Sequence, residues 1–507
     1  MKKTILLFGL LFVVSGFIKA QNVYIPDANF KAYLLARASI NTNGDNEIQV
    51  SEAAAYNSVI YCSDKNISDL TGIEAFVNIT ELSCRNNQLT SLNVSKNTAL
   101  INLYCDGNQL ESLDISKNTS LKRLDCQNNK LTGLDLNKNI ALKTLYCHDN
   151  QLGNLDLSQN ASLTSLVCHN NQLANLDVSK CTILASLDCY NNQLTTLDIS
   201  KNLVLTTLQC NNNQLASLDV SKNTVLSWLY CHENQLTSLD ISKNTLLETL
   251  ACNNNLLTNL DLSKNTVLEF LYCNDNQLTN LDMSKNTVLL QLYCYNNQLI
   301  NLDISMNLVL TRLWCYQNQL KNLDVSKNIA LRILHCAQNQ LTNIDVSKNT
   351  DLVSLLCNNN QLTTLNIKNG NNANVYEYTY DDETGLGIGF DSRNNSNLFC
   401  IQVDNSSAGY LANWQKDATA SYNPNCSLSV NDSSKKEIAL YPNPVKEILN
   451  FSEEVSNIKI ADASGRIVKQ FSAPRRSLEL INLARGAYII TGITKERETV
   501  SNKFIKE

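Results

Sequence analysis

The stretch 226–244, LSWLYCHENQLTSLDISKN, is one copy of a unit that recurs almost unchanged along most of the chain. Its cysteine recurs with a period of 21 residues, and one further cysteine precedes the series by 22. The members of this cysteine ladder are Cys62, Cys84, Cys105, Cys126, Cys147, Cys168, Cys189, Cys210, Cys231, Cys252, Cys273, Cys294, Cys315, Cys336 and Cys357. A fixed period of this length predicts a solenoid, in which each turn buries its apolar edge against the next.

Within one turn, Leu229 and Cys231 alternate with outward residues, which predicts a short strand with one face inward. Asn234 follows at a turn, and its amide offers two donors and an acceptor to the backbones of neighbouring turns. The second half of the repeat, from Leu236 to Asn244, has almost the same spacing as the first. Little room remains for a helix, so we expect extended segments or tight turns on the convex side. At about 4.8 Å per turn, the stack should be roughly 70 Å long.

The cysteine ladder has three possible interpretations: disulfides, a metal site or a row of free thiols. In-register strands hold their Cβ vectors parallel, which suits disulfides badly, and a leucine-lined interior lacks the convergent geometry of a zinc site. Cysteine buries readily, so we expect a row of reduced, buried thiols. Cys181 lies outside the ladder, where it replaces the asparagine of Ser-Lys-Asn. We expect it to be an isolated convex thiol that reagents reach easily.

The N-terminal end combines an export signal with a cap. Residues 1–20 begin with Lys2 and Lys3, continue in an apolar run and end in Ile18-Lys19-Ala20, which predicts a signal peptide. The mature chain shows no other candidate for a transmembrane span. Residues 21–60 should cap the first turn, with a helix within 27–37.

A candidate calcium loop follows that helix at 41–52. Oxygen-bearing side chains stand where an EF-hand loop needs them, at Asn41, Asn43, Asp45, Glu47 and Glu52, with Ile48 at the apolar position. Two features depart from the pattern: asparagine stands at position 1, and glycine stands at position 4 with Asn46 at position 6. A polar cap turn is the alternative. No cofactor other than this calcium is expected.

The sequence pattern changes in the C-terminal part of the chain. After the repeats, which span 61–369, residues 370–426 break the period and should cap the far end. Cys400 and Cys426 lie outside the ladder of a secreted chain, and we pair them as a disulfide. Residues 427–436 read as a polar linker. Residues 437–507 contain short alternating segments between turns, which predicts a small antiparallel β-sandwich.

Two resemblances follow from these motifs. The repeat resembles the leucine-rich repeats, with cysteine at the third apolar position, of bacterial surface proteins such as internalin J. Residues 437–507 resemble the sorting domain of type IX secretion substrates of the Bacteroidota, in the segments LYPNP (440–444), IADASGR (460–466), LARGAY (483–488) and KFIK (503–506). The second resemblance implies export, contact with the type IX machinery, and either release or attachment at the outer-membrane surface.

Little in the sequence indicates catalysis or nucleic-acid binding. The net charge is −6 with both signs interspersed, and no hydrolase, metalloprotease or phosphate-loop motif is present. His148 and His169 share a register in adjacent turns, about 5 Å apart on the sheet. A two-histidine metal site is one interpretation, but the sequence shows no evident carboxylate partner, and a solvated position is the other.

The outward strand positions carry many aromatic residues. Tyr104, Tyr146 and Tyr190 are the first of them along the chain. We expect the later ones to form a ligand-binding patch together with one arginine: Trp228, Tyr230, Phe270, Tyr272, Tyr293, Tyr295, Arg312, Trp314 and Tyr316. The alternative is cross-strand stacking that only stabilises the sheet. The sequence therefore predicts a non-enzymatic, adhesin-like protein, secreted or at the cell surface, that recognises a protein or glycan. A structural spacer without a specific ligand is the alternative.

Overall fold

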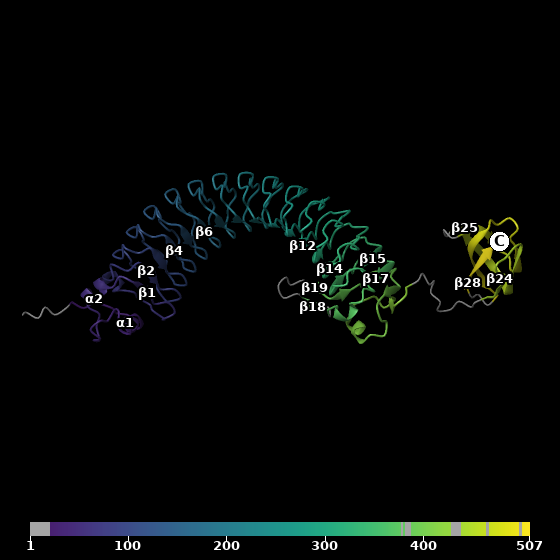
Figure 1. Cartoon of the computed structure of the whole chain (residues 1–507), viewed down its shortest axis with the longest axis horizontal. Coiled ribbons are helices and arrows are strands. Elements are labelled where there is room, and N and C mark those ends of the chain that lie inside the picture. Colours follow the sequence, from purple (N-terminus) through teal and green to yellow (C-terminus); the bar gives the residue numbers. More distant parts are fainter. Residues whose placement is uncertain (1–20, 377–378, 381–386, 427–437, 463–465, 496–498) are drawn as a thin grey trace, which may run out of the picture. The chain divides into compact units, whose positions relative to one another are not determined.

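The computed structural model describes residues 21–376, 379–380, 387–426, 438–462, 466–495 and 499–507 (Figure 1). The expected signal peptide, 1–20, and the expected linker, 427–436, lie outside the described residues. The chain divides into two compact units, one up to Pro424 and one from Asn425 onward. Each unit is described by itself.

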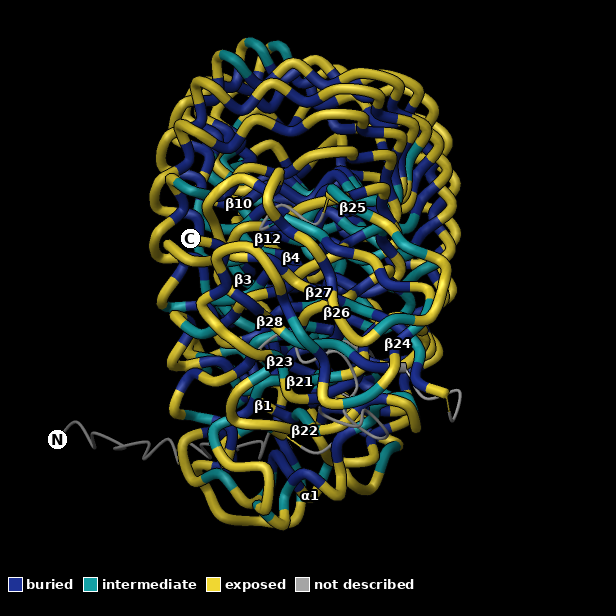
Figure 2. Tube along the Cα trace, turned by 90° about the vertical axis from the view of Figure 1, so that its right-hand side faces the viewer, coloured by how far each residue is buried: buried dark blue, intermediate teal, exposed yellow. Residues whose placement is uncertain are grey.

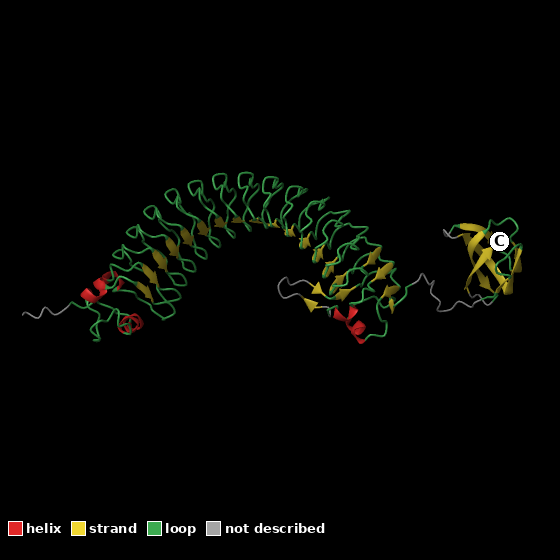
Figure 3. Ribbon diagram, viewed as in Figure 1, coloured by secondary structure: helices red, strands yellow, loops and turns green. Residues whose placement is uncertain are grey.

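The first unit is a curved solenoid whose strands line its concave edge, while loops form the convex edge (Figures 1 and 3). The strands form one 16-stranded sheet in the order β1 to β14, then β16 and β20. Its members are β1 Val59–Tyr61, β2 Glu81–Ser83, β3 Asn102–Tyr104, β4 Arg123–Asp125, β5 Thr144–Tyr146, β6 Ser165–Val167, β7 Ser186–Asp188, β8 Thr207–Gln209, β9 Trp228–Tyr230, β10 Thr249–Ala251, β11 Phe270–Tyr272, β12 Gln291–Tyr293, β13 Arg312–Trp314, β14 Ile333–His335, β16 Ser354–Leu356 and β20 Phe390–Asp391. The leucine-rich-repeat solenoid with a parallel sheet and little helix is therefore confirmed.

The 21-residue period fixes the register of this sheet. Each strand leucine lies opposite the leucine of the next turn, as Leu229 does opposite Leu250. Leu226, Leu229, Cys231 and Leu236 are fully buried. Figure 2 shows dark blue, buried stretches that recur along the stacked turns. Burying one leucine contributes roughly 1.5–3 kcal/mol, so every turn adds a similar apolar increment to one continuous core.

A ladder of asparagine amides joins the turns at the end of each strand. Asn213 donates from Nδ2 to the carbonyl oxygens of Cys189, Cys210 and Asn211 at 3.1, 3.1 and 3.2 Å. Its Oδ1 accepts the backbone N–H of Leu194 at 3.0 Å. The amide thus bonds to its own turn and to the preceding one, as expected from the sequence.

Replacing Asn213 by alanine should destabilise the solenoid by about 3 kcal/mol, because several buried backbone groups lose their partners. Chemical unfolding followed by circular dichroism measures this change. The matched control is Gln214→Ala, since the neighbouring Gln214 side chain is exposed. Equal midpoints for the two variants would contradict the role given to the amide.

A second asparagine column lies in the other half of the turn and corrects one prediction. The asparagine of Ser-Lys-Asn is fully buried, as at Asn202, whose Nδ2 donates to the carbonyls of Val178 and Cys181 at 3.1 and 2.8 Å. Cys181 occupies this column, is fully buried, and donates from Sγ to the Asn160 carbonyl at 3.5 Å. The expectation of an accessible convex thiol was wrong, because side chains of this column point into the stack.

The described free cysteines should therefore all resist labelling in the native protein. All sixteen are buried, and burial raises the pKa of Cys210 to about 12 and that of Cys181 to about 11. A thiol reagent at neutral pH should modify none of them until denaturant is added, as intact mass would show. Rapid native labelling of Cys181 or of several ladder positions would contradict this packing.

The exposed aspartates of the second half-turn have a backbone role. No ion pair joins the aspartates of the repeated Asp-x-Ser-Lys segment to lysines among the described residues. Asp240 instead accepts the backbone N–H of Ser242 at 2.9 Å, and that hydrogen bond lowers its pKa. The repeated aspartate closes a tight turn, which explains its regularity.

The N-terminal cap contains the predicted helix. α1, Ala28–Leu35, begins after Asp27, whose Oδ1 accepts the N–H groups of Asn29 and Phe30 at 2.9 Å. The other oxygen of Asp27 accepts the N–H of Ser68 at 2.8 Å and so joins the cap to the first turns. A second short helix, α2, spans Val50–Ala55, and the apolar side of the cap includes fully buried Phe30.

At the far end the solenoid continues past residue 369. Asn395 extends the amide ladder, since it donates to the Cys357 carbonyl at 3.1 Å and accepts the N–H of Leu362 at 3.0 Å. A second, four-stranded sheet forms here, in the order β15 Asn343–Asp345, β17 Thr364–Asn366, β21 Cys400–Gln402 and β22 Ser421–Asn423. The short elements at this end are η2 Asn372–Asn374, β18 Thr379–Tyr380, β19 Gly387–Ile388 and η3 Gly409–Asn413. One further short helix, η1 Ile73–Ala75, lies near the first turns. Cys400 and Cys426 are disulfide-bonded.

The second unit is a curled antiparallel sheet of six strands: β23 Leu440–Tyr441, β24 Ile448–Asp462, β25 Ile467–Phe471, β26 Arg475–Glu479, β27 Gly486–Thr494 and β28 Thr499–Lys506. The first half of β24 pairs with β23 and β26, and its second half pairs with β25 and β27. Asn443 joins two sequence motifs, since it donates to the Lys503 carbonyl at 3.1 Å and accepts the N–H of Ile505 at 2.9 Å. The predicted antiparallel strands are confirmed, but they form one curled sheet and not the two sheets of a sandwich.

Candidate ligand-binding face

Three columns of side chains cover the concave sheet: the residue before the strand leucine, the residue between leucine and cysteine, and the residue after cysteine. Over the fourteen turns from β2 to β16, the strand leucine and the ladder cysteine never change. In the same turns the first column contains nine residue types, from Glu81 to Ser354. Variation is therefore concentrated where side chains face outward.

The predicted aromatic patch divides into exposed and buried parts. Trp228 is 42% exposed, whereas Tyr230, Phe270, Tyr272, Tyr293, Tyr295, Arg312 and Tyr316 are partly buried. Trp314 is only 1% exposed, so the prediction that it is open to a ligand was wrong. Its ring lies against Tyr293, with centroids 4.2 Å apart and planes 6° apart, and its other side meets the edge of His335.

Two aromatic stacks run along the sheet in this region. In the first, Tyr272 meets Tyr293 edge-on and Tyr293 stacks on Trp314. In the second, Tyr295 stacks on Tyr316 with centroids 4.3 Å apart, and Tyr316 stacks on His335 of the adjacent column at 4.2 Å. Strand spacing is close to ring spacing, so flat side chains in one column stack and cover each other. These contacts between rings stabilise the sheet.

His335 should make stability depend on pH. Burial lowers its pKa from 6.5 to about 3, so its contribution is complete above pH 6.5 and is lost as the pH falls towards 3. His335→Phe keeps a flat ring and removes the titration. Melting temperatures measured from about pH 7.5 to about 4.5 should therefore fall less for this variant than for the wild type. Parallel curves would contradict the assignment.

The opposite end of the concave face holds a charged cluster that sequence reasoning missed. Asp125 is buried and accepts from Arg85 at 2.5 Å and from Arg123 at 2.9 Å. The Arg85 guanidinium also lies 4.3 Å from the centre of the Tyr104 ring. The available signal was opposite charges in the outward columns, with Arg123 in the same turn as Asp125 and Arg85 two turns before it.

The candidate calcium loop has a connected arrangement of hydrogen bonds. Glu52 accepts from Thr42 at 2.7 Å, Asn43 at 3.1 Å and Gln49 at 3.0 Å; burial opposes ionisation, but these bonds lower its pKa. Asp45 accepts from the Asn43 and Gln49 amides at 2.9 Å.

The other two residues of the loop differ in their surroundings. Glu47 pairs with Lys31 at 2.8 Å. Asn41 is buried, and its Oδ1 has no hydrogen-bond partner. Hydrogen bonds connect Asn43 with Asp45 and Glu52, whereas the Glu47 carboxylate turns to Lys31; calcium binding stays a prediction.

The fold and this face define a class: a leucine-rich-repeat protein with a cysteine ladder. The functional domain of InlJ from Listeria monocytogenes, described as including a cysteine ladder, is 28% identical with a TM-score of 0.66, covering 96% of this chain and 99% of that one. A leucine-rich-repeat protein of Leptospira interrogans is 21% identical with a TM-score of 0.53, covering 62% of this chain and 92% of that one. A plant peptide hormone receptor, RGFR1 in complex with RGF2, is 19% identical with a TM-score of 0.56, covering 68% and 61%. The last two show the fold alone.

The C-terminal unit identifies the route of export. Residues 439–507 match the secretion system C-terminal sorting domain, so the protein is directed to the cell surface or the extracellular medium. No curated protein sequence matches the chain. Among the described residues, no helix combines the length and apolarity needed to cross a membrane.

Proposed function

We propose that this protein is a non-enzymatic, adhesin-like recognition protein, which binds an extended protein or glycan on its concave face after export. One observation carries the proposal: the outward columns of the strands vary from turn to turn, while the strand leucine, the ladder cysteine and the strand-end asparagine stay constant. Exposed positions elsewhere in the turn vary as well, but the strand columns are the ones that line the concave sheet. Extended concave surfaces are the usual binding surfaces of repeat proteins.

Trp228 is the best anchor for such a ligand. It is 42% exposed, at the end of the aromatic region opposite to the buried Trp314 stack. Its register neighbour in the next turn is Thr249, which is followed by Phe270. An exposed indole next to other partly buried rings offers large contact area with little loss of side-chain entropy on binding.

A spacer without a specific ligand is the second candidate. The nearly complete burial of Trp314 between Tyr293 and His335 favours it, because that stack is explained by sheet stability alone. The two candidates differ at Trp228, since a spacer gains nothing from an exposed indole.

The test compares two tryptophan variants on arrays of immobilised glycans and of candidate host proteins. Trp228→Ala should weaken binding to each array hit by about 2 kcal/mol and leave the unfolding midpoint unchanged, as expected for an exposed hot-spot residue. Trp314→Ala should cost about 3 kcal/mol of stability, as expected for a buried aromatic side chain. Array hits that bind Trp228→Ala as tightly as the wild type would contradict the proposal, and a wild type without any hit would favour the spacer.

A further inference from the structure

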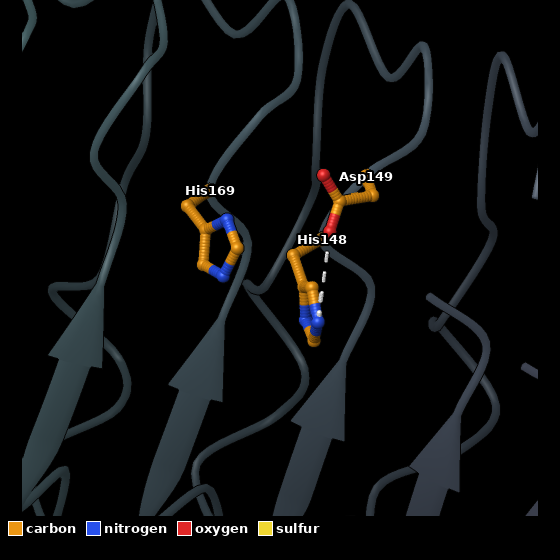
Figure 4. A group of neighbouring side chains, drawn as sticks. All are labelled: His148, Asp149 and His169. Carbon is orange, nitrogen blue, oxygen red and sulfur yellow. Dashed lines mark ion pairs between the residues drawn. The ribbon is translucent and has the colours of Figure 1, made fainter. Parts of the chain in front are cut away.

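His148, His169 and Asp149 form a cluster on the concave side of the solenoid, at the ends of β5 and β6 (Figure 4). Each residue offers one ligand atom, and these three atoms lie within 4.8 Å of one another. A carboxylate partner for the two histidines was not expected from the sequence. The turn that follows His148 brings Asp149 back towards the imidazole, with Oδ2 3.8 Å from Nε2 of His148.

The two imidazoles are held in place by stacking. Their centroids lie 4.3 Å apart with planes inclined by 27°, and Tyr190 stacks on the other side of His169 at 4.1 Å. Nδ1 of each histidine is buried and has no hydrogen-bond partner. Nε2 of His148 is the nitrogen that faces the carboxylate, as Figure 4 shows.

Asp149 is oriented by a chain of amides from three successive turns. Asn170 donates to Oδ1 of Asp149 at 2.7 Å, Asn191 donates to Asn170 at 2.6 Å, and Asn212 donates to Asn191 at 2.6 Å. This chain fixes one carboxylate oxygen and leaves the other directed towards His148. Hydrogen bonds of this kind to a carboxylate are what orients it in metal sites.

The protonation state also suits metal binding. Burial lowers the pKa of His148, and burial together with His148 lowers the pKa of His169 to about 4. Asp149 and Asp125 act in the opposite direction on His148 but do not outweigh burial. Both imidazoles are therefore neutral near pH 7, which is the form that binds a metal ion.

We propose that His148, His169 and Asp149 bind a divalent transition-metal ion such as zinc, nickel or copper. Two imidazoles and one carboxylate suit ions of this class, whereas calcium and magnesium prefer oxygen ligands. Two ligands of tetrahedral zinc lie roughly 3.3 Å apart, so at least one imidazole must turn out of the parallel stack for the three atoms to reach one ion. Three protein ligands leave a coordination position open for water or for a group of a bound partner.

The test is calorimetric titration of zinc chloride into the untagged full chain at neutral pH, with cobalt absorption as the spectroscopic readout. The wild type should bind one equivalent of zinc at micromolar concentration. His148→Phe, His169→Phe and Asp149→Asn should each weaken binding at least tenfold. The phenylalanine variants keep a flat ring in the stack, and an unchanged melting temperature without metal shows that the fold is intact.

His232 supplies the matched control, because it occupies the same column in a later turn between Asn211 and Asn253 and has no second histidine beside it. His232→Phe should bind zinc as the wild type does. The proposal is overturned if the wild type binds no zinc in the micromolar range, or if His232→Phe weakens binding as much as His148→Phe. It is also overturned if a folded variant that combines His148→Phe, His169→Phe and Asp149→Asn still binds one equivalent of zinc.

Discussion

The carboxamide of one asparagine at the end of each strand closes its own turn and bonds to the turn before it. Asn213 bonds to the carbonyls of Cys189 and Cys210 and to the N–H of Leu194, and it shares the Asn211 carbonyl with the N–H of Asn191. Because the donors and the acceptor of one amide bond to both turns, the distance between neighbouring turns can vary little. Leucine and cysteine then stack in single columns, and curvature, register and core all follow from repetition of one 21-residue unit.

This constraint leaves the concave face free to vary. Side chains there bear on the stacking of turns only through their own neighbours, so different chemistry can occupy different stretches of one sheet. Arg85 and Asp125 form a charged region, His148 and His169 mark a histidine region, and Trp228 begins an aromatic region. A ligand that lies along the arc would meet these regions in sequence, which supports a recognition role better than a spacer role.

Much of the fold could be predicted from the sequence because the period is explicit. The register of Leu229, the amide contacts of Asn234 and the antiparallel C-terminal unit required only periodicity and turn chemistry. The exposure of each side chain within a column could not be predicted, since the burial of Trp314 depends on the rings of neighbouring turns. Cys181 and Asp149 were misjudged because their directions depend on turn conformation, and Asp149 has a left-handed φ of 52°.

The most direct test of the account is to delete one complete turn, residues 238–258, and compare it with deletion of half a turn, residues 238–247. Both ends of the larger deletion lie at equivalent positions of the repeat, so every amide contact can form again. Small-angle scattering and circular dichroism should show a folded solenoid, shorter along its arc by about 4.8 Å. The smaller deletion should lose cooperative unfolding, because it places the two halves of the stack out of register. If both deletions fold equally well, the amide ladder does not set the register and the account is wrong.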